Sequence, residues 1–181
     1  MLIYALTEDA EMRALEPWNA AEFTTFIERH RDHLAPWLPW AQSLTDLDQT
    51  RAWLQRYAEN QAQDGGRIYG IWLKGELVGG TLYRVFDSRF GTAEIGVWLA
   101  PQAQGKGLIT LAARRMIAWA IDERGLNRIE WRCVPTNKRS IAVAKRLGMA
   151  RDGVLREAFP YNGVNHDVEI YSLLASEWRN G

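Results

Sequence analysis

The sequence predicts an α/β domain in which helices pack on one mixed β-sheet. Two helical stretches come first, β-rich segments follow, and the second half alternates helix, strand, helix, strand, strand. A strand–helix–strand unit near the middle of that order places a parallel pair within a mixed sheet. The chain has 181 residues, of which 47% are hydrophobic. That is enough for one core and short for two, so residues 1–181 are expected to form a single domain.

The first helix is predicted from its N-terminal signal. Asn19 followed by Glu22 is a capping-box pattern, and a helix is expected from there to about His33. The segment Pro36–Trp40 is predicted to be a stiff loop that presents two indoles. The reason is that Pro39 has no backbone N–H and restricts the residue before it.

A second helix and a hairpin are predicted next. Thr45 is expected to cap the helix, which Gly65–Gly66 ends. The hairpin is expected to turn at Gly75–Glu76, a two-residue connection between β-rich runs. The extended segments predicted in this half are Leu2–Leu6, Met12–Leu15, Arg67–Lys74, Leu77–Phe86 and Thr92–Leu99.

Helical and alternating patterns continue through the second half. Apolar residues at helical spacing predict helices over Leu108–Arg124 and Asn137–Leu147, each followed by a glycine. The remaining strands are predicted at Arg128–Val134, Met149–Ala158 and Val168–Leu174.

Composition excludes several classes of protein. Lys plus Arg and Asp plus Glu both total 22, so no charge excess indicates a nucleic-acid or membrane partner. No run of about 18 apolar residues occurs, and we expect a cytoplasmic protein. The one cysteine, Cys133, is expected to face the core, so it is not expected to act as a nucleophile. The three histidines are joined by no Cys or Asp cluster, and no metal is expected.

The segment Gln102–Gly107, "QAQGKG", lies between a predicted strand and a predicted helix. Glycines there leave backbone N–H groups open to ligand oxygens, so a phosphate cradle is one interpretation and an ordinary turn the other. A dinucleotide fingerprint would need a glycine at Thr110. A nucleotide P-loop would need a glycine at Ala100 and Ser or Thr after Lys106. Both nucleotide motifs are therefore broken.

The same segment resembles the cofactor loop of the GNAT superfamily of N-acetyltransferases, (Gln/Arg)-x-x-Gly-x-(Gly/Ala). The stretch "NKRSIAVAKRLGM" is similar to the helix that follows in that family. "EIGVWLAP", "LREAFPYNGVNHDVEIYSLL" and "LAPWLPW" resemble the branch of the ribosomal-protein alanine N-acetyltransferases RimJ and RimL. The resemblance implies a mostly antiparallel twisted sheet of about seven strands, splayed at the cofactor site, with about four helices.

The resemblance implies acetyl-CoA as co-substrate. The loop amides would bind its pyrophosphate at a helix N-terminus, and the backbone of the preceding strand would pair with the pantetheine arm. The residues expected to bind acetyl-CoA are Val97, Trp98, Leu99, Gln102, Gln104, Gly105, Lys106, Gly107, Leu108, Ile109, Asn137 and Ser140.

Two catalytic residues are implied. Glu94, on the strand that leads to the loop, is the candidate base, because many superfamily members use a carboxylate there; an ion-paired or solvent-facing glutamate is the alternative. The tyrosine that many relatives use as the acid falls at Ala144. In the RimL-like branch a serine at the position of Ser140 is implied as the acid instead, with a capping or surface serine as the alternative. Direct attack by an amine in a ternary complex is expected.

The amine itself is less defined. The resemblance to RimJ and RimL implies the N-terminal α-amine of a protein. Trp37, Trp40 and Trp53 support a second interpretation, a small amine such as an aminoacyl-nucleotide antibiotic, because facing indoles stack on a flat base. Alternatively, these tryptophans close the core. A CoA-binding sensor without turnover is a third possibility. Dimers are common among similar proteins, so a homodimer is one assembly that the sequence leaves open.

Overall fold

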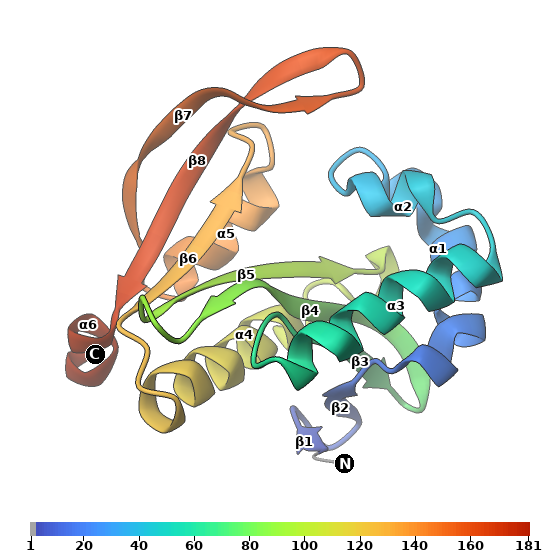
Figure 1. Cartoon of the computed structure of the whole chain (residues 1–181), viewed down its shortest axis with the longest axis horizontal. Coiled ribbons are helices and arrows are strands. Elements are labelled where there is room, and N and C mark those ends of the chain that lie inside the picture. The colour runs from blue at the N-terminus through green and yellow to red at the C-terminus, as the bar shows by residue number, and fades with distance from the viewer. Residues whose placement is uncertain (1–2) are drawn as a thin grey trace. The chain divides into compact units, whose positions relative to one another are not determined.

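The computed structural model describes residues 3–181, whose strands pair in one mixed sheet (Figure 1). The sheet order is β1-β2-β3-β4-β5-β6-β8-β7. In chain order the elements are β1 (Tyr4–Ala5), β2 (Ala10–Ala14), α1 (Ala20–Leu34), α2 (Pro39–Ser43), α3 (Leu47–Ala62), β3 (Ile68–Leu73), β4 (Glu76–Asp87), β5 (Thr92–Leu99), α4 (Leu108–Ala118), β6 (Arg128–Cys133), α5 (Lys138–Arg146), β7 (Ala150–Tyr161), β8 (Val164–Leu174) and α6 (Ala175–Asn180).

The predicted α/β class is confirmed, with more elements than expected. Residues 3–181 contain eight strands and six α-helices, where the resemblance implied about seven and about four. The extra helices are the short α2 and the C-terminal α6, which periodicity over a few residues does not reveal. No helix in this part of the chain is long and apolar enough to cross a bilayer.

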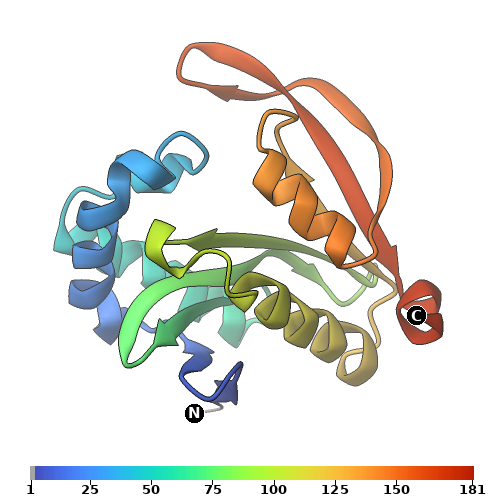
Figure 2. The same cartoon turned by 180° about the vertical axis from the view of Figure 1, so that it is seen from behind.

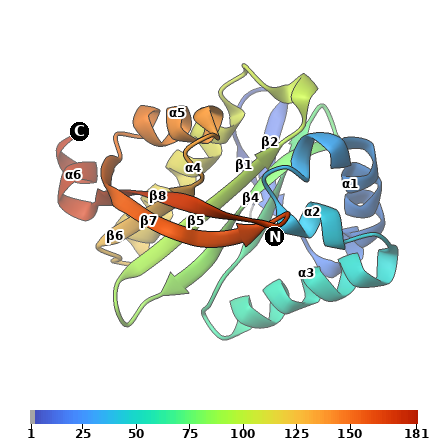
Figure 3. The same cartoon turned by 90° about the horizontal axis from the view of Figure 1, so that it is seen from above.

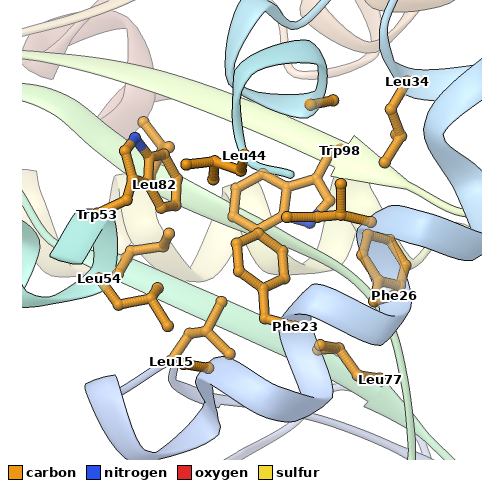
Figure 4. Close-up of a cluster of buried hydrophobic side chains, with 14 of the residues drawn as sticks. Leu15, Phe23, Phe26, Leu34, Leu44, Trp53, Leu54, Leu77, Leu82 and Trp98 are labelled. Carbon is orange, nitrogen blue, oxygen red and sulfur yellow. The ribbon is translucent and has the colours of Figure 1, made fainter. Parts of the chain in front are cut away.

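The chain divides into two compact units, and the first comprises the residues up to Tyr83 together with Val97–Ala112. Helices α1, α2 and α3 gather together in it, as Figure 3 shows. Its core is a cluster of buried apolar side chains from these helices and from strands β3 to β5 (Figure 4). Phe23 lies at the middle of this cluster, with ring centroids 5.9 Å from Trp53 and 6.0 Å from Trp98.

The second unit comprises Arg84–Gly96 and Ala113–Gly181. In it Thr92–Glu94 of β5 pairs in parallel with Arg128–Glu130 of β6, and β6 pairs antiparallel with β8. Helix α5 packs beside β6 (Figure 2). Strands β7 and β8 form a long hairpin that turns at Asn162–Gly163, both with positive φ, as a two-residue turn requires.

Several predicted ends need correction. The first hairpin turns at Lys74–Gly75, with φ of 53° and 81°, and Glu76 already belongs to β4. Pro39 begins α2, because its missing N–H has no cost at the first helical position, so the prediction that Pro36–Trp40 is not helical was wrong for its last two residues. The last strands are longer than predicted, and a π-helical turn at Trp119–Glu123 follows α4. Of the first predicted segment, Leu2 lies outside the described residues.

Asn19 is the N-cap residue of α1 as predicted, but the predicted capping box and the predicted Thr45 cap were wrong. Asn19 Oδ1 accepts a hydrogen bond from the Glu16 N–H, and Glu22 accepts one from Trp72 Nε1 at 2.8 Å, so these two do not form the capping box. The second long helix is capped by Asp46, whose Oδ1 accepts from the Gln49 N–H at 2.8 Å, and not by Thr45. Glu22 bonds to a residue that is distant along the chain, and the capping role at α3 falls one residue after the predicted position. A local sequence pattern predicts neither outcome.

Candidate active site

The glycine loop after β5 opens helix α4. Gly105 and Gly107 have φ of 77° and 72°, the left-handed region that glycine adopts without strain, and a Cβ at either would meet no atom within 4 Å. Within residues 3–181 the backbone N–H groups from Gly105 to Thr110 have no hydrogen-bond partner, whereas that of Leu111 donates to the Gly107 carbonyl at 3.0 Å. Open space and unpaired N–H groups at a helix N-terminus fit a bound pyrophosphate.

The two glutamines of the loop turn toward helix α1. Gln104 Nε2 lies 3.1 Å from His33 Nε2, and Gln102 Nε2 lies 3.4 Å from His30 Nε2. Their side chains therefore contact α1, and the Gln104 N–H donates to the Pro101 carbonyl oxygen at 3.2 Å. Lys106 is exposed, as an ordinary surface lysine also is, and Leu108 is buried.

The strand before the loop carries a buried donor. Trp98 is 4% exposed and lies in the aromatic core of the first unit, and its Nε1–H has no partner within residues 3–181. The glycine at position 80 makes room for this ring, because a Cβ there would lie 2.2 Å from Trp98 Cζ2. Val97 and Leu99, on either side of Trp98, are half-buried.

Glu94 lies on β5 in the second unit, held by two arginines. Arg84 Nε and Nη2 donate to its two carboxylate oxygens, both at 2.6 Å, and Arg132 Nε is 3.5 Å from Oε2. The carboxylate is 7% exposed. This bidentate geometry corresponds to the ion-paired alternative for Glu94, and a proton acceptor here has to share its oxygens with guanidinium groups.

Ser140 lies in the first turn of α5, where the chain fixes both its backbone and its hydroxyl. Asn137 caps the helix, and its Oδ1 accepts from the Ser140 N–H at 3.2 Å. Trp131 Nε1 on β6 donates to Ser140 Oγ at 2.8 Å. Because an indole N–H is only a donor, Oγ acts as the acceptor in this bond and its own proton is directed elsewhere. The Ser140 hydroxyl is thus held by Trp131 and also hydrogen-bonds with Cys133.

Cys133 is a neighbour of this serine. The side chain is buried, and burial raises the pKa of its thiol, an effect that the hydrogen bond with Ser140 partly offsets. A protonated, buried thiol is a poor nucleophile, which agrees with the expected core position of Cys133.

The sequence family follows from the comparison of the whole chain with known proteins. Residues 12–150 match the family described as Acetyltransferase (GNAT) domain. The chain belongs to this family. The relative YdaF of Bacillus subtilis (strain 168) is 33% identical, with 98% of each chain covered. The ribosomal-protein-serine acetyltransferase of Escherichia coli (strain K12) is 26% identical over 93% of this chain and 94% of its own length.

The fold is shared with a solved acetyltransferase structure. The structure described as RimL, a ribosomal L7/L12 alpha-N-protein acetyltransferase in complex with coenzyme A, has a TM-score of 0.91 and 24% identity. It covers 97% of this chain, and this chain covers 99% of it. The predicted GNAT fold and the predicted enzyme class are therefore confirmed: this chain is a GNAT acetyltransferase.

The three tryptophans of the predicted substrate site have unequal surroundings in this acetyltransferase. Trp53 belongs to the buried core, and Trp40 packs against it with ring centroids 5.5 Å apart. A flat base between two rings needs about 7 Å, twice the usual contact distance, so these two indoles as they stand form no slot. Trp37 is 39% exposed. The assignment of the three to a substrate stays a prediction.

Three residues of the acetyltransferase site were missed from the sequence. Arg84 and Arg132, which hold Glu94, come from two other strands, and only strand register brings them to β5. Trp131 carried a partial signal, because alternation along β6 gave it the same face as Cys133. Within residues 3–181 no group of His, Cys, Asp and Glu is arranged to hold a metal ion.

Proposed function

We propose that this acetyltransferase moves the acetyl group of acetyl-CoA to the N-terminal α-amine of a protein. The observation that carries the proposal is the row of unpaired N–H groups from Gly105 to Thr110, an anion site at a helix start. A protein amine is supported by the Escherichia coli relative named for a ribosomal-protein serine. A ribosomal substrate places the reaction in the cytoplasm.

Each residue has a defined part in the proposed reaction. Acetyl-CoA supplies an activated thioester when bound. The loop amides and the backbone of Val97–Leu99 hold it, with Asn137 fixing the start of α5. The amine nitrogen forms a bond to the carbonyl carbon as the carbon–sulfur bond breaks. Ser140 gives its hydroxyl proton to the departing thiolate, and Trp131 holds the oxygen as it does so.

Glu94 is the proposed acceptor for the proton that the amine loses. An α-amine titrates near pH ~8, so part of it is already neutral at pH 7 and the demand on the base is small. The contact of Glu94 with Arg132, at 3.5 Å, is longer than the 2.6 Å pair with Arg84. Both arginines contact Oε2, whereas Arg84 alone contacts Oε1. Oε1 is therefore the oxygen on which a proton, passed directly or through water, is accepted more readily.

The experiment that tests the proposal offers two separate amine pools with acetyl-CoA. One pool contains peptides with free N-termini, including those beginning with Ser and Ala, and the other contains aminoacyl nucleotides. Thiol release is followed, and mass spectrometry locates the added acetyl group. Acetylated peptide N-termini are expected. Reaction with nucleotides alone would overturn the protein substrate. Bound acetyl-CoA without turnover in either pool would favour a sensor.

The acid has its own test. Ser140→Ala removes the donor and leaves the helix cap, so kcat is expected to fall at least about tenfold while the Kd of acetyl-CoA stays within about twofold. Stopped assays and calorimetry measure the two quantities on the same preparation. Unchanged turnover in Ser140→Ala contradicts the assignment of the acid.

A further inference from the structure

Helix α1 contacts the cofactor loop through two histidines in its last turn. His30 and His33 are three residues apart, so they lie on one face of the helix. His33 Nε2 is 3.2 Å from the Leu99 carbonyl oxygen and 3.1 Å from Gln104 Nε2, whereas His30 meets Gln102 at 3.4 Å. His33 is thus the closer of the two and touches the loop at two points.

The chemistry of these contacts defines the role of the ring. A carbonyl oxygen only accepts, so His33 Nε2 carries a proton and donates it toward Leu99. A protonated ring nitrogen cannot accept from an amide NH2 group. For both contacts to be hydrogen bonds, the Gln104 amide has to place its oxygen, in the position given to Nε2, at the 3.1 Å contact. One N–H is shared between the two acceptors.

The two contact points are the ends of one segment. Leu99 is the last residue of β5, and Gln104 directly precedes Gly105. The 3-10 turn Pro101–Ala103 lies between them. We infer that His33 is a positioning residue for the pyrophosphate loop: its imidazole ties the end of β5 to Gln104 and so fixes where the glycines of the loop begin.

The glycines explain why such a tie is useful. Gly105 and Gly107 are the residues with the greatest conformational freedom, and neither has an atom within 4 Å of a Cβ position that would restrain it. Ordering them when a ligand binds costs free energy, and a loop held beforehand loses less. The imidazole supplies that order through its contacts with Leu99 and Gln104. This inference rests on the proposed use of acetyl-CoA.

The neighbouring histidine supplies a contrast. Burial lowers the pKa of His30, and the nearby His33 and Arg29 act in the same direction. Its partner Gln102 is exposed and lies within the 3-10 turn, not at the end of the segment. His33, unlike His30, contacts both ends of the segment, at Leu99 and at Gln104.

The test measures the binding of CoA and of pantetheine, which lacks the pyrophosphate and the 3′-phosphoadenosine attached to it. Calorimetry gives Kd for CoA and for pantetheine with the wild type, His33→Ala, Gln104→Ala and the double variant. Loss of the tie is expected to weaken CoA about tenfold in His33→Ala, with pantetheine unchanged within about twofold. The double variant is expected to be no weaker than His33→Ala, because both changes break one bridge. His33→Gln, which keeps a donor, is expected to recover most of the affinity.

Each outcome is decisive. His166→Ala, a histidine on β8 that contacts Phe159, is the control and should bind both ligands as the wild type does. Equal weakening of CoA and pantetheine, or losses that multiply in the double variant, would overturn the positioning role. If CoA binds the wild type and His33→Ala equally, the inference fails and the proposed function stands. If the wild type binds no CoA, the proposed function fails and the inference with it.

Discussion

At the scale of single residues, Trp131 is the side chain whose chemistry decides most about Ser140. Trp131→Phe keeps an aromatic ring in a fully buried position and removes only the N–H that Ser140 Oγ accepts at 2.8 Å. We expect kcat to fall about three- to tenfold with KM for acetyl-CoA unchanged, since one hydrogen bond is worth about 1 kcal/mol. Steady-state kinetics measure both.

Two controls separate positioning from general damage. Trp178 on α6 donates a comparable hydrogen bond, from its indole Nε1 to Asp122 at 3.1 Å. Trp178→Phe removes this bond and should leave kcat unchanged. In a Ser140→Ala background, Trp131→Phe should have no further effect on kcat, because the group on which it acts is gone. A further fall in that background would show that Trp131 acts on something other than Ser140.

The sequence singles out candidate residues by their place in a motif, but it does not reveal contacts between positions that are distant along the chain. The resemblance indicated Ser140 and Glu94 by their place in a motif. It gave no sign of Arg84 and Arg132, because the pairing of strands, and not spacing along the chain, sets which side chains share a carboxylate. Alternation placed Trp131 on a face, but not its N–H toward a serine on the next helix.

At the scale of elements, the cofactor loop yields a prediction with an internal control. Gly107 and Gly125 have similar backbone conformations, with φ of 72° and 70°. A Cβ at either position would meet no atom within 4 Å. Leucine at either position carries a similar backbone strain. Gly107→Leu is expected to weaken acetyl-CoA binding about tenfold or more, because its side chain enters the anion site, and Gly125→Leu should bind normally. Calorimetry measures the affinity for acetyl-CoA, and thermal melts check that both variants are folded. Equal affinities in the two variants would contradict the assignment of this loop as the pyrophosphate site.

Strand β4 gives a second element-scale prediction. Gly80→Ala places a Cβ 2.4 Å from the Tyr69 carbonyl oxygen and 2.2 Å from the Trp98 ring, so the strand or the ring must shift. The free energy of unfolding in urea is expected to fall by at least about 1–3 kcal/mol. Gly153→Ala on β7, where a Cβ meets nothing within 4 Å, is the control and should change it little. Similar losses in both variants would contradict the role of Trp98.

The order of elements was predictable because periodicity of two and of 3.6 residues changes visibly along the chain. Their ends were not, because an end depends on a backbone angle or on a partner elsewhere. The first hairpin shifted by one residue since Lys74 adopts a positive φ, which glycine and not lysine usually signals. The cap of α3 shifted from Thr45 to Asp46 for a similar reason, since either residue suits the position.

At the scale of the whole molecule, stability in acid depends on carboxylates that are ionised in the fold. Arg128 on β6 reaches Asp152 on β7 and Glu130 on its own strand, with the Glu130 contact at 2.9 Å. The hydrogen bond from Arg128 lowers the pKa of Asp152. For Glu130, burial acts to raise the pKa, but hydrogen bonds from Arg128 and Arg132 outweigh it and the pKa is lowered.

The sign of the pH dependence follows from these directions. A carboxylate whose pKa is lower in the folded state contributes stability above its unfolded pKa and loses it as pH falls through the folded value. The ordinary values here are 4.5 for Glu130 and 3.8 for Asp152, so the contribution is complete at pH 7 and declines below about pH 4. Arg128→Gln should therefore lower Tm at pH 7, and the difference from the wild type should shrink toward pH 3.

A control variant with the same change in net charge separates the effect of the ion pairs from the effect of net charge. Arg156 lies exposed on β7, and within residues 3–181 it has no ion pair, so Arg156→Gln changes the net charge equally. Its Tm difference from the wild type should be small at pH 7. If Arg128→Gln and Arg156→Gln shift Tm alike at every pH, the lowered carboxyl pKa values do not stabilise the fold. If the two variants differ in Tm near pH 7 but not near pH 3, the loss of stability in acid is due to the carboxylates that pair with Arg128.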